Sequence, residues 1–167
     1  MFIRPETEQD HQAISDLVYA AFLNHPVHAP GALPTEHTIV NGLRAAGALS
    51  LSLVAEESGE IVGHIAFSEV LIDGEKAGWY GLGPVAARPG CQRRGIGSAL
   101  INQGIGALRE RGARGIALVG DPGYYVRFGF APDPELVLEG VPPEYFLVLS
   151  LAFPKAAGKV TFHAAFA

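Results

Sequence analysis

The segment that decides the fold reads Val85-Ala86-Ala87-Arg88-Pro89-Gly90-Cys91-Gln92-Arg93-Arg94-Gly95-Ile96-Gly97-Ser98. An apolar strand is followed by a basic turn, and a helix begins near Gly95. Free amides at a helix N-terminus carry partial positive charge and bind anions. Because Gly95 and Gly97 lack a Cβ atom, a phosphate group can approach the backbone closely. Arg93 and Arg94 add positive charge, so the segment indicates a site for a phosphate-bearing ligand.

Two common nucleotide-binding motifs fit this segment poorly. A dinucleotide fingerprint requires a third glycine where the chain has Leu100, and an acidic residue about 20 residues further on. The apolar stretch at residues 115–119 supplies no such acid. A phosphate loop of the Walker type requires Gly-Lys followed by Ser or Thr, which the sequence lacks.

On both sides of the segment, hydrophobic periodicity predicts a mixed α/β order of elements. We expect strands at residues 2–4, 49–55, 61–70, 79–87, 115–119, 146–153 and 160–166. We expect helices after Thr7, at 35–46, from Gly95 to Gly112 and, as one short turn, at 124–127. The dipeptides Ser58-Gly59 and Asp73-Gly74 predict tight turns between antiparallel strands.

Composition narrows the class of protein. The chain has 167 residues, 49% hydrophobic and 17% charged, which suits one folded domain over residues 1–167. A net charge of -5 argues against nucleic acid as the main partner. A single cysteine, Cys91, and the absence of a signal-peptide pattern favour the cytoplasm. The longest apolar run, at residues 146–153, is too short to span a bilayer, so no membrane partner is expected.

The loop Gln92-x-x-Gly95-x-Gly97 resembles the Gln/Arg-x-x-Gly-x-Gly/Ala loop of the GNAT superfamily of N-acetyltransferases. Two neighbouring segments strengthen the likeness. The strand before the loop resembles the strand that lies along pantetheine in that family, and Tyr125 to Phe130 resembles its Tyr-x-x-x-Gly-Phe segment. Residues 121–130, read as Asp-Pro-x-Tyr-Tyr-x-Arg-Phe-Gly-Phe, are similar to a subgroup of predicted bacterial N-acetyltransferases.

The resemblance implies a fold, a co-substrate and a reaction. The fold would be a mixed, mostly antiparallel central sheet flanked by helices, splayed at the fourth and fifth strands. The reaction would be direct transfer of an acetyl group from acetyl-CoA to a primary amine. The implied cofactor-binding residues are Val85, Ala86, Ala87, Gln92, Arg93, Arg94, Gly95, Ile96, Gly97, Ser98 and Tyr125. Of these, Val85 and Ala87 would contact pantetheine, residues 93–98 the pyrophosphate, and Gln92 would brace the turn.

The resemblance also implies catalytic roles. Tyr125 would protonate the departing sulfur, and a backbone amide near Val85 would polarise the thioester carbonyl. A lysine-type amine titrates near ~10.4, so that a base or water relay is needed. Many relatives carry a Glu on the fourth strand, but residues 79–87 contain no carboxylate. Glu69 or His64 on the preceding strand, acting through water, are the expected bases.

Plainer interpretations stand beside these roles. His64 on an apolar strand is also typical of a hydrogen-bonded core histidine, and Tyr125 of a core aromatic. His25 and His28 lack a third ligand nearby, so no metal site is expected. The missing fourth-strand carboxylate leaves open a non-catalytic acyl-CoA binding or sensing module.

The acceptor is expected to be a small-molecule or peptide amine. In the superfamily, its site is built from the first helices, their loop and the last strands, here residues 22–46 and 145 onward. The apolar final strands also suggest pairing across a homodimer.

Overall fold

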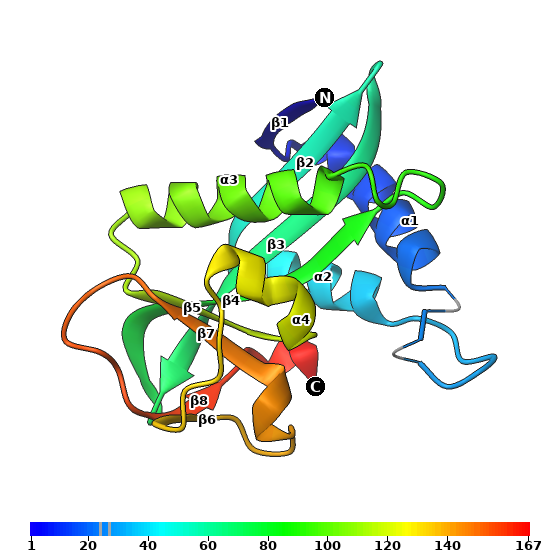
Figure 1. Ribbon diagram of the computed structural model, residues 1–167. Coiled ribbons are helices and arrows are strands. Elements are labelled where there is room, and N and C mark those ends of the chain that lie inside the picture. The colour runs from blue at the N-terminus through cyan, green and yellow to red at the C-terminus, as the bar shows by residue number, and fades with distance from the viewer. Residues whose placement is uncertain (24, 27) are drawn as a thin grey trace.

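A computed structural model describes residues 1–23, 25–26 and 28–167, and Figure 1 shows the arrangement of its helices and strands. The helices are α1 (His11–Phe22), α2 (Glu36–Ala45), α3 (Ile96–Glu110) and α4 (Pro122–Tyr125). The strands are β1 (Phe2–Pro5), β2 (Leu49–Glu57), β3 (Glu60–Ile72), β4 (Glu75–Ala87), β5 (Gly115–Val119), β6 (Leu136–Val137), β7 (Phe146–Ser150) and β8 (Gly158–Thr161). None of the helices in this part of the chain has the length and apolar composition that a bilayer crossing requires.

The strands form one mixed sheet in the order β1-β2-β3-β4-β5-β7, and β8 pairs with β3 and β6. The pairs along the main path are antiparallel except β4 with β5, which run parallel. The two predicted turns are confirmed, because Ser58 and Asp73 have φ of 52° and 51° and each is followed by a glycine with positive φ. Two consecutive residues with positive φ are typical of the tight hairpin turn whose twist matches that of the flanking strands. The expected mixed, mostly antiparallel sheet is confirmed.

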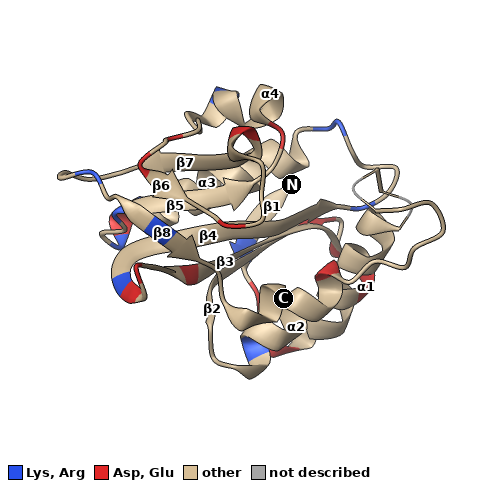
Figure 2. Cartoon of the chain, turned by 90° about the horizontal axis from the view of Figure 1, so that it is seen from below, with Lys and Arg blue, Asp and Glu red and all other residues tan. Residues whose placement is uncertain are grey.

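Helices cover both faces of the sheet, with α1 and α2 on one side and α3 on the other (Figure 2). On α3, Ile101, Ile105 and Leu108 are buried against the sheet, as the helical spacing predicts. On α1, Ile14 and Val18 are fully buried in a second cluster on the opposite face. Each amphipathic helix thus buries one apolar stripe, and the sheet is buried on both faces.

Strands β4 and β5 part soon after they meet (Figure 1). Their pairing covers only Trp79, Tyr80 and Gly81 on β4, although β4 continues to Ala87. The far part of β4 is also irregular, because Leu82 lies opposite Phe67 and Val85 opposite Ile65. Two residues, Gly83 and Pro84, thus face a single residue of β3, which is a β-bulge of the kind common beside active sites. The expected splay at the fourth and fifth strands is confirmed.

Several expected boundaries are wrong. The strand predicted at 146–153 ends at Ser150, where the chain turns toward Pro154, a residue that cannot donate a ladder hydrogen bond. The strand predicted at 160–166 ends at Thr161, and Ala164–Phe166 forms a 3-10 turn. The strand expected at 79–87 already begins at Glu75, since a two-residue turn lets pairing start at once. Strand β6 was not predicted, because two residues carry no periodicity.

Candidate active site

The turn between β4 and α3 is held in shape by Gln92. Its Nε2 donates to the carbonyl of Ala87 at 3.2 Å, and its Oε1 accepts from the amide of Gly90 at 3.0 Å. The predicted bracing of the turn by Gln92 is confirmed by these two bonds. The chain then enters α3 through Gly95, whose φ of +80° suits a residue without a side chain.

The N-terminus of α3 presents backbone donors. The first bond of the helix joins the amide of Ala99 to the carbonyl of Gly95. The amides of Ile96, Gly97 and Ser98 therefore have no acceptor within the helix. Such amides and the helix dipole favour an anion in front of them. The Ile96 side chain itself is buried in the core, so only its backbone faces this position.

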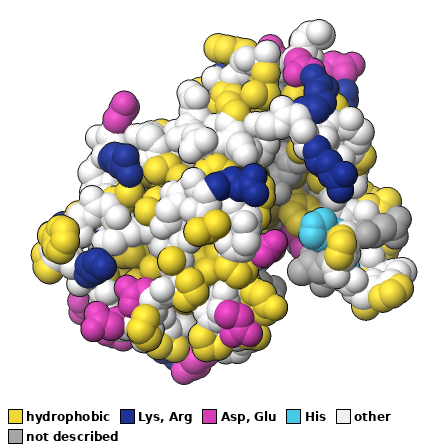
Figure 3. Space-filling view, viewed as in Figure 1, with side chains coloured by type: hydrophobic (Ala, Val, Ile, Leu, Met, Phe, Trp, Pro, Cys, Tyr) yellow, Lys and Arg dark blue, Asp and Glu magenta, His cyan; other side chains and the backbone are white. Residues whose placement is uncertain are grey.

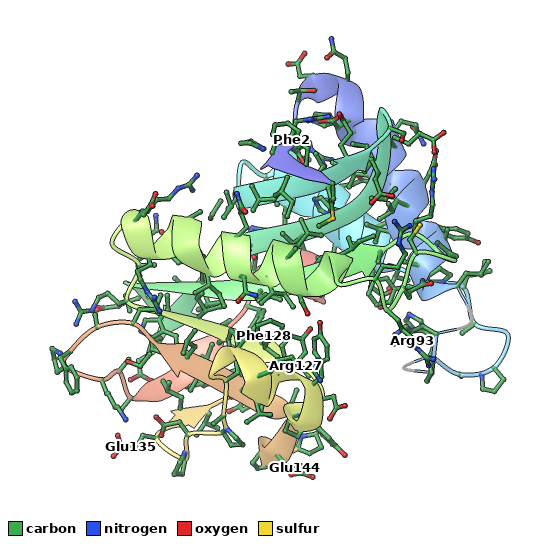
Figure 4. The ribbon with its side chains drawn as sticks, turned by 45° about the horizontal axis from the view of Figure 1, so that its top comes forward. Phe2, Arg93, Arg127, Phe128, Glu135 and Glu144 are labelled. Atoms are coloured by element: carbon green, nitrogen blue, oxygen red, sulfur yellow. The ribbon has the colours of Figure 1, made fainter. Side chains whose placement is uncertain are left out.

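The arginines around this turn differ in their partners. Arg94 pairs with Glu57 at 2.9 Å and Arg88 with Glu60 at 2.8 Å. Arg93, with φ of 67°, makes no ion pair with any residue that the structure describes. Arg127 donates to the carbonyl of Tyr124 and stacks over its ring. In Figure 4, Arg93 lies on the turn beyond β4 and Arg127 beside α4, so that two cations flank the open end of the strand pair.

Tyr125 is the last residue of α4 and packs against the aromatic rings of its own segment. Its ring contacts Phe130 edge-on at a centroid distance of 6.0 Å, and a Cβ on Gly120 would lie 2.6 Å from its Cε2. Burial raises the pKa of the Tyr125 hydroxyl to about 12. Tyr124, beside it, reaches the N-terminus of α3, because its hydroxyl lies 3.4 Å from Ser98 Oγ. The two tyrosines thus lie side by side between the helix N-terminus and the end of β5.

His64 lies on the other face of the sheet, beneath α1 and α2, and is fully buried. Its Nε2 is 2.8 Å from Ser52 Oγ, which donates to Glu6, and Glu6 in turn accepts from Arg44. Burial lowers the pKa of His64 to about 4, against the opposing attraction of Glu6. This buried network fits the core-histidine interpretation of the sequence, although Nδ1 of His64 has no partner among the described residues.

Glu69 lies further along β3, away from the splay. It is opposite Tyr80, whereas Val85 is opposite Ile65, a separation of roughly 15 Å along β4. Glu69 is 3.7 Å from Lys76 Nζ and lines a separate cavity with it. The structure therefore brings Tyr125 and the loop residues to one region and does not bring His64 or Glu69 there.

A cavity of about 380 Å³ opens where β4 leaves β5. Its walls come from α1, α2, the far end of β4, the end of β5 and the C-terminal segment. They consist of Phe22, Glu36, Ile39, Leu82, Gly83, Pro84, Val119, Leu138, Glu139, Val141, Phe162 and Phe166. Part of this lining falls in the acceptor region expected at 22–46 and from 145 onward, and the remainder comes from residues 82–84, 119 and 138–141. Figure 3 shows a hollow right of centre, with basic side chains above it and acidic and histidine side chains along its lower and right-hand edges.

A splayed parallel pair that leads into an anion-binding helix start is the arrangement implied above for an acyltransferase. Residues 2–132 match the sequence profile of the family described as "Acetyltransferase (GNAT) domain". The uncharacterized N-acetyltransferase YhbS of Escherichia coli (strain K12) is 34% identical over 131 residues, which cover 78% of this chain and 73% of YhbS. The chain therefore belongs to the GNAT family of acetyltransferases.

Solved structures agree with this family. A GNAT family acetyltransferase from Brucella melitensis, solved in complex with acetyl-CoA, is 48% identical with a TM-score of 0.86. The alignment covers 99% of this chain and 97% of that one. The Escherichia coli YhbS structure, solved in complex with CoA, is 31% identical with a TM-score of 0.88 and covers 99% and 91% of the two chains.

Sequence reasoning missed two features of this region. Arg127 reads as an exposed helix charge, and nothing in its neighbours indicates that it flanks the open strand pair. Glu36 reads as an ordinary acid in the first turn of a helix, because its position in the cavity depends on how α2 packs against β4.

Proposed function

We propose that this GNAT acetyltransferase moves the acetyl group of acetyl-CoA directly to a primary amine in a ternary complex. The observation that carries the proposal is the far part of β4, from Leu82 to Ala87. One edge of this part pairs with β3, and the other edge is unpaired because β5 has diverged from it. The strand then leads to the free backbone amides at the N-terminus of α3.

The cofactor would complete this open edge. A pantetheine arm contains amide groups that can pair with the free edge of β4 at Val85 and Ala87, with Ala86 between them. The pyrophosphate oxygens would accept hydrogen bonds from the backbone amides of residues 95–98. Arg93 would add positive charge, as would Arg127, which the sequence did not indicate as a cofactor-binding residue. Arg94 would act from its ion pair with Glu57, as a support for the turn.

In the proposed reaction, Tyr125 is the acid that protonates the departing sulfur. The ammonium first loses one proton, and the amine lone pair attacks the acetyl carbonyl carbon. As the new C–N bond forms, the C–S bond breaks and its electron pair stays on sulfur. Tyr125 gives its proton to that sulfur and regains one from the nitrogen through water. A pKa of about 12 keeps the hydroxyl protonated and able to donate at neutral pH.

Glu69 and His64 stay the predicted bases for the proton that the ammonium group loses first. His64 is enclosed by its network and Glu69 faces another cavity, so either residue would act only through several waters. The variants His64→Gln and Glu69→Gln test them. Replacing a catalytic base changes the acidic limb of the plot of kcat/KM against pH, whereas replacing a structural residue changes only the stability of the fold.

The rival hypothesis, a non-catalytic acyl-CoA module, is not favoured by membership of an acetyltransferase family.

We further propose that residues 1–167 act as one domain, supported by a sheet that takes strands from both ends of the chain. A cytoplasmic location is supported by the single free thiol of Cys91. A homodimer through the final strands stays a prediction. It is supported by β7 as the edge of the sheet path, although Ala131 already occupies that edge at Val148.

Isothermal titration with acetyl-CoA, followed by free-thiol release over a panel of amines, tests the proposal. We expect micromolar binding and thiol release with some amines. Binding without release under any amine would favour the sensing module, and absence of binding would refute the cofactor site.

A further inference from the structure

We propose that the 380 Å³ cavity between α1, α2 and β4 is the acceptor site for a small primary amine with an apolar body, and that Glu36 binds its ammonium group. The inference rests on the proposed function and specifies its substrate class. Candidates of this class are arylalkyl amines and branched alkyl amines.

The walls of the cavity are mainly apolar. Phe22, Ile39, Leu82 and Phe162 are among the aromatic and aliphatic side chains that line it. Its volume lies near the lower end of the range of about 300–1,000 Å³ for small-molecule sites. An apolar lining of this size favours a compact hydrophobic group, because burial of each CH₂ removes apolar surface from water.

The charge of the cavity is negative. Its titratable wall residues are Glu36 and Glu139, and the described lining contains neither lysine nor arginine. Glu139 is 73% exposed and pairs with Lys159 at 3.1 Å, so its charge is largely offset. The side chain of Glu36 is only 17% exposed, and water screens it less than a surface carboxylate. The partner of Glu36 among the described residues is His28, which carries a positive charge only when protonated. Charge complementarity therefore favours a cation beside Glu36 over an anionic or neutral acceptor.

The carboxylate of Glu36 is held in position by its own segment. His28 Nε2 lies 2.9 Å from Glu36 Oε1, and the amide of Thr35 donates to the same oxygen at 3.2 Å. Within the described residues, both hydrogen bonds end on Oε1, which leaves Oε2 for a ligand. Glu36 is also the first residue of α2, where the helix dipole favours a negative charge. His28 is thus a positioning residue for the ammonium-binding carboxylate.

The cavity reaches the reacting centre. Leu82, Gly83 and Pro84 line it and also form the part of β4 that β5 leaves. Val119, the last residue of β5, lines it from the other strand. An amine that enters between α1 and α2 therefore arrives at the opening in the sheet, where the proposed thioester lies.

Titration calorimetry with three ligands tests the inference on the full chain, both free and saturated with CoA. 2-Phenylethylamine has the apolar body and the charge, 2-phenylethanol only the body, and ethanolamine only the charge. We expect the first to bind at least tenfold more tightly than the other two. Glu36→Gln should remove the preference for the amine over the alcohol, while Glu36→Asp should retain part of it.

Glu135→Gln is the matched control, since Glu135 is exposed and does not line the 380 Å³ cavity. It should bind all three ligands like the unchanged chain. Unaltered CoA affinity of Glu36→Gln shows that this variant is folded.

Equal binding of amine and alcohol would overturn the inference, as would a preference that survives Glu36→Gln. Thiol release with a lysine peptide or with ethanolamine, but not with 2-phenylethylamine, would overturn the substrate class and leave acetyl transfer standing. Failure of the proposed function is separate, because it appears as loss of acetyl-CoA binding, which these amine titrations do not require.

Discussion

Replacing Tyr125 by Phe removes one hydroxyl and leaves the aromatic packing in place. The ring keeps its contacts with Tyr124, Phe128 and Phe130, at centroid distances of 5.0, 6.2 and 6.0 Å. No hydrogen bond joins the Tyr125 hydroxyl to another described residue. We therefore expect the free energy of unfolding to change by no more than about 0.5 kcal/mol.

Turnover should fall far more than stability. A positioned general acid contributes about 10²- to 10⁴-fold to a rate, which corresponds to about 3–5 kcal/mol in the activation barrier. With a pKa of about 12, the Tyr125 hydroxyl is protonated at the pH of the assay, so the whole population can donate. We expect kcat for thiol release to fall by that factor, while the Kd for CoA in titration calorimetry stays within about threefold.

Tyr124→Phe is the control for this experiment. It removes a neighbouring hydroxyl that lies 3.4 Å from Ser98 Oγ, at the N-terminus of α3. Its effect should appear in the KM for acetyl-CoA and not in kcat. If Tyr125→Phe retains kcat within a factor of three, or if Tyr124→Phe loses more, Tyr125 is not the acid.

Three further perturbations test the fold and the loop. Gly104→Ala should lower the free energy of unfolding by about 1–3 kcal/mol, because its Cβ would collide with the ring of Phe67. Gly106→Ala, on the exposed side of the same helix, should raise it by about 0.5–1 kcal/mol. Urea unfolding measures both changes, and changes of the same sign would refute the packing of α3. Gly95→Val should raise the Kd for CoA at least tenfold, because φ of +80° strains a β-branched residue, and unchanged affinity in calorimetry would count against the loop. His64 has a folded pKa of about 4 and an unfolded value of 6.5, so the unfolded chain binds more protons in that interval, and stability should fall as the pH drops from 6.5 to 4 by on the order of 3 kcal/mol. Urea midpoints in that range that do not fall with pH would show that His64 is not buried as a neutral base.

The sequence was sufficient for the order of the elements and for the loop. Turn dipeptides such as Asp73-Gly74 and the helical spacing of Ile101, Ile105 and Leu108 are local signals that the packing did not override. The bracing by Gln92 was also predictable, since a loop motif fixes residues that are close in sequence.

The cavity and the surroundings of the proposed bases were not predictable in the same way. Whether His64 faces the cofactor or the network of Glu6 depends on which face of β3 meets α1 and α2. Glu36 meets Leu82 in one cavity although the two are distant in sequence, which depends on packing between elements. Spacing along the chain contains no information about such contacts.

The free edge of β4 also affects solubility. A strand with unpaired backbone groups is a template on which another chain can add itself, and proteins usually hide or charge such edges. Here the bulge at Gly83 and Pro84, in the pairing with β3, bends β4. The proposed cofactor would cover the free edge. A bound ligand at 100 times its Kd would stabilise the fold by about 2.7 kcal/mol. Preparations stripped of coenzyme A should therefore self-associate sooner on storage than preparations that retain it.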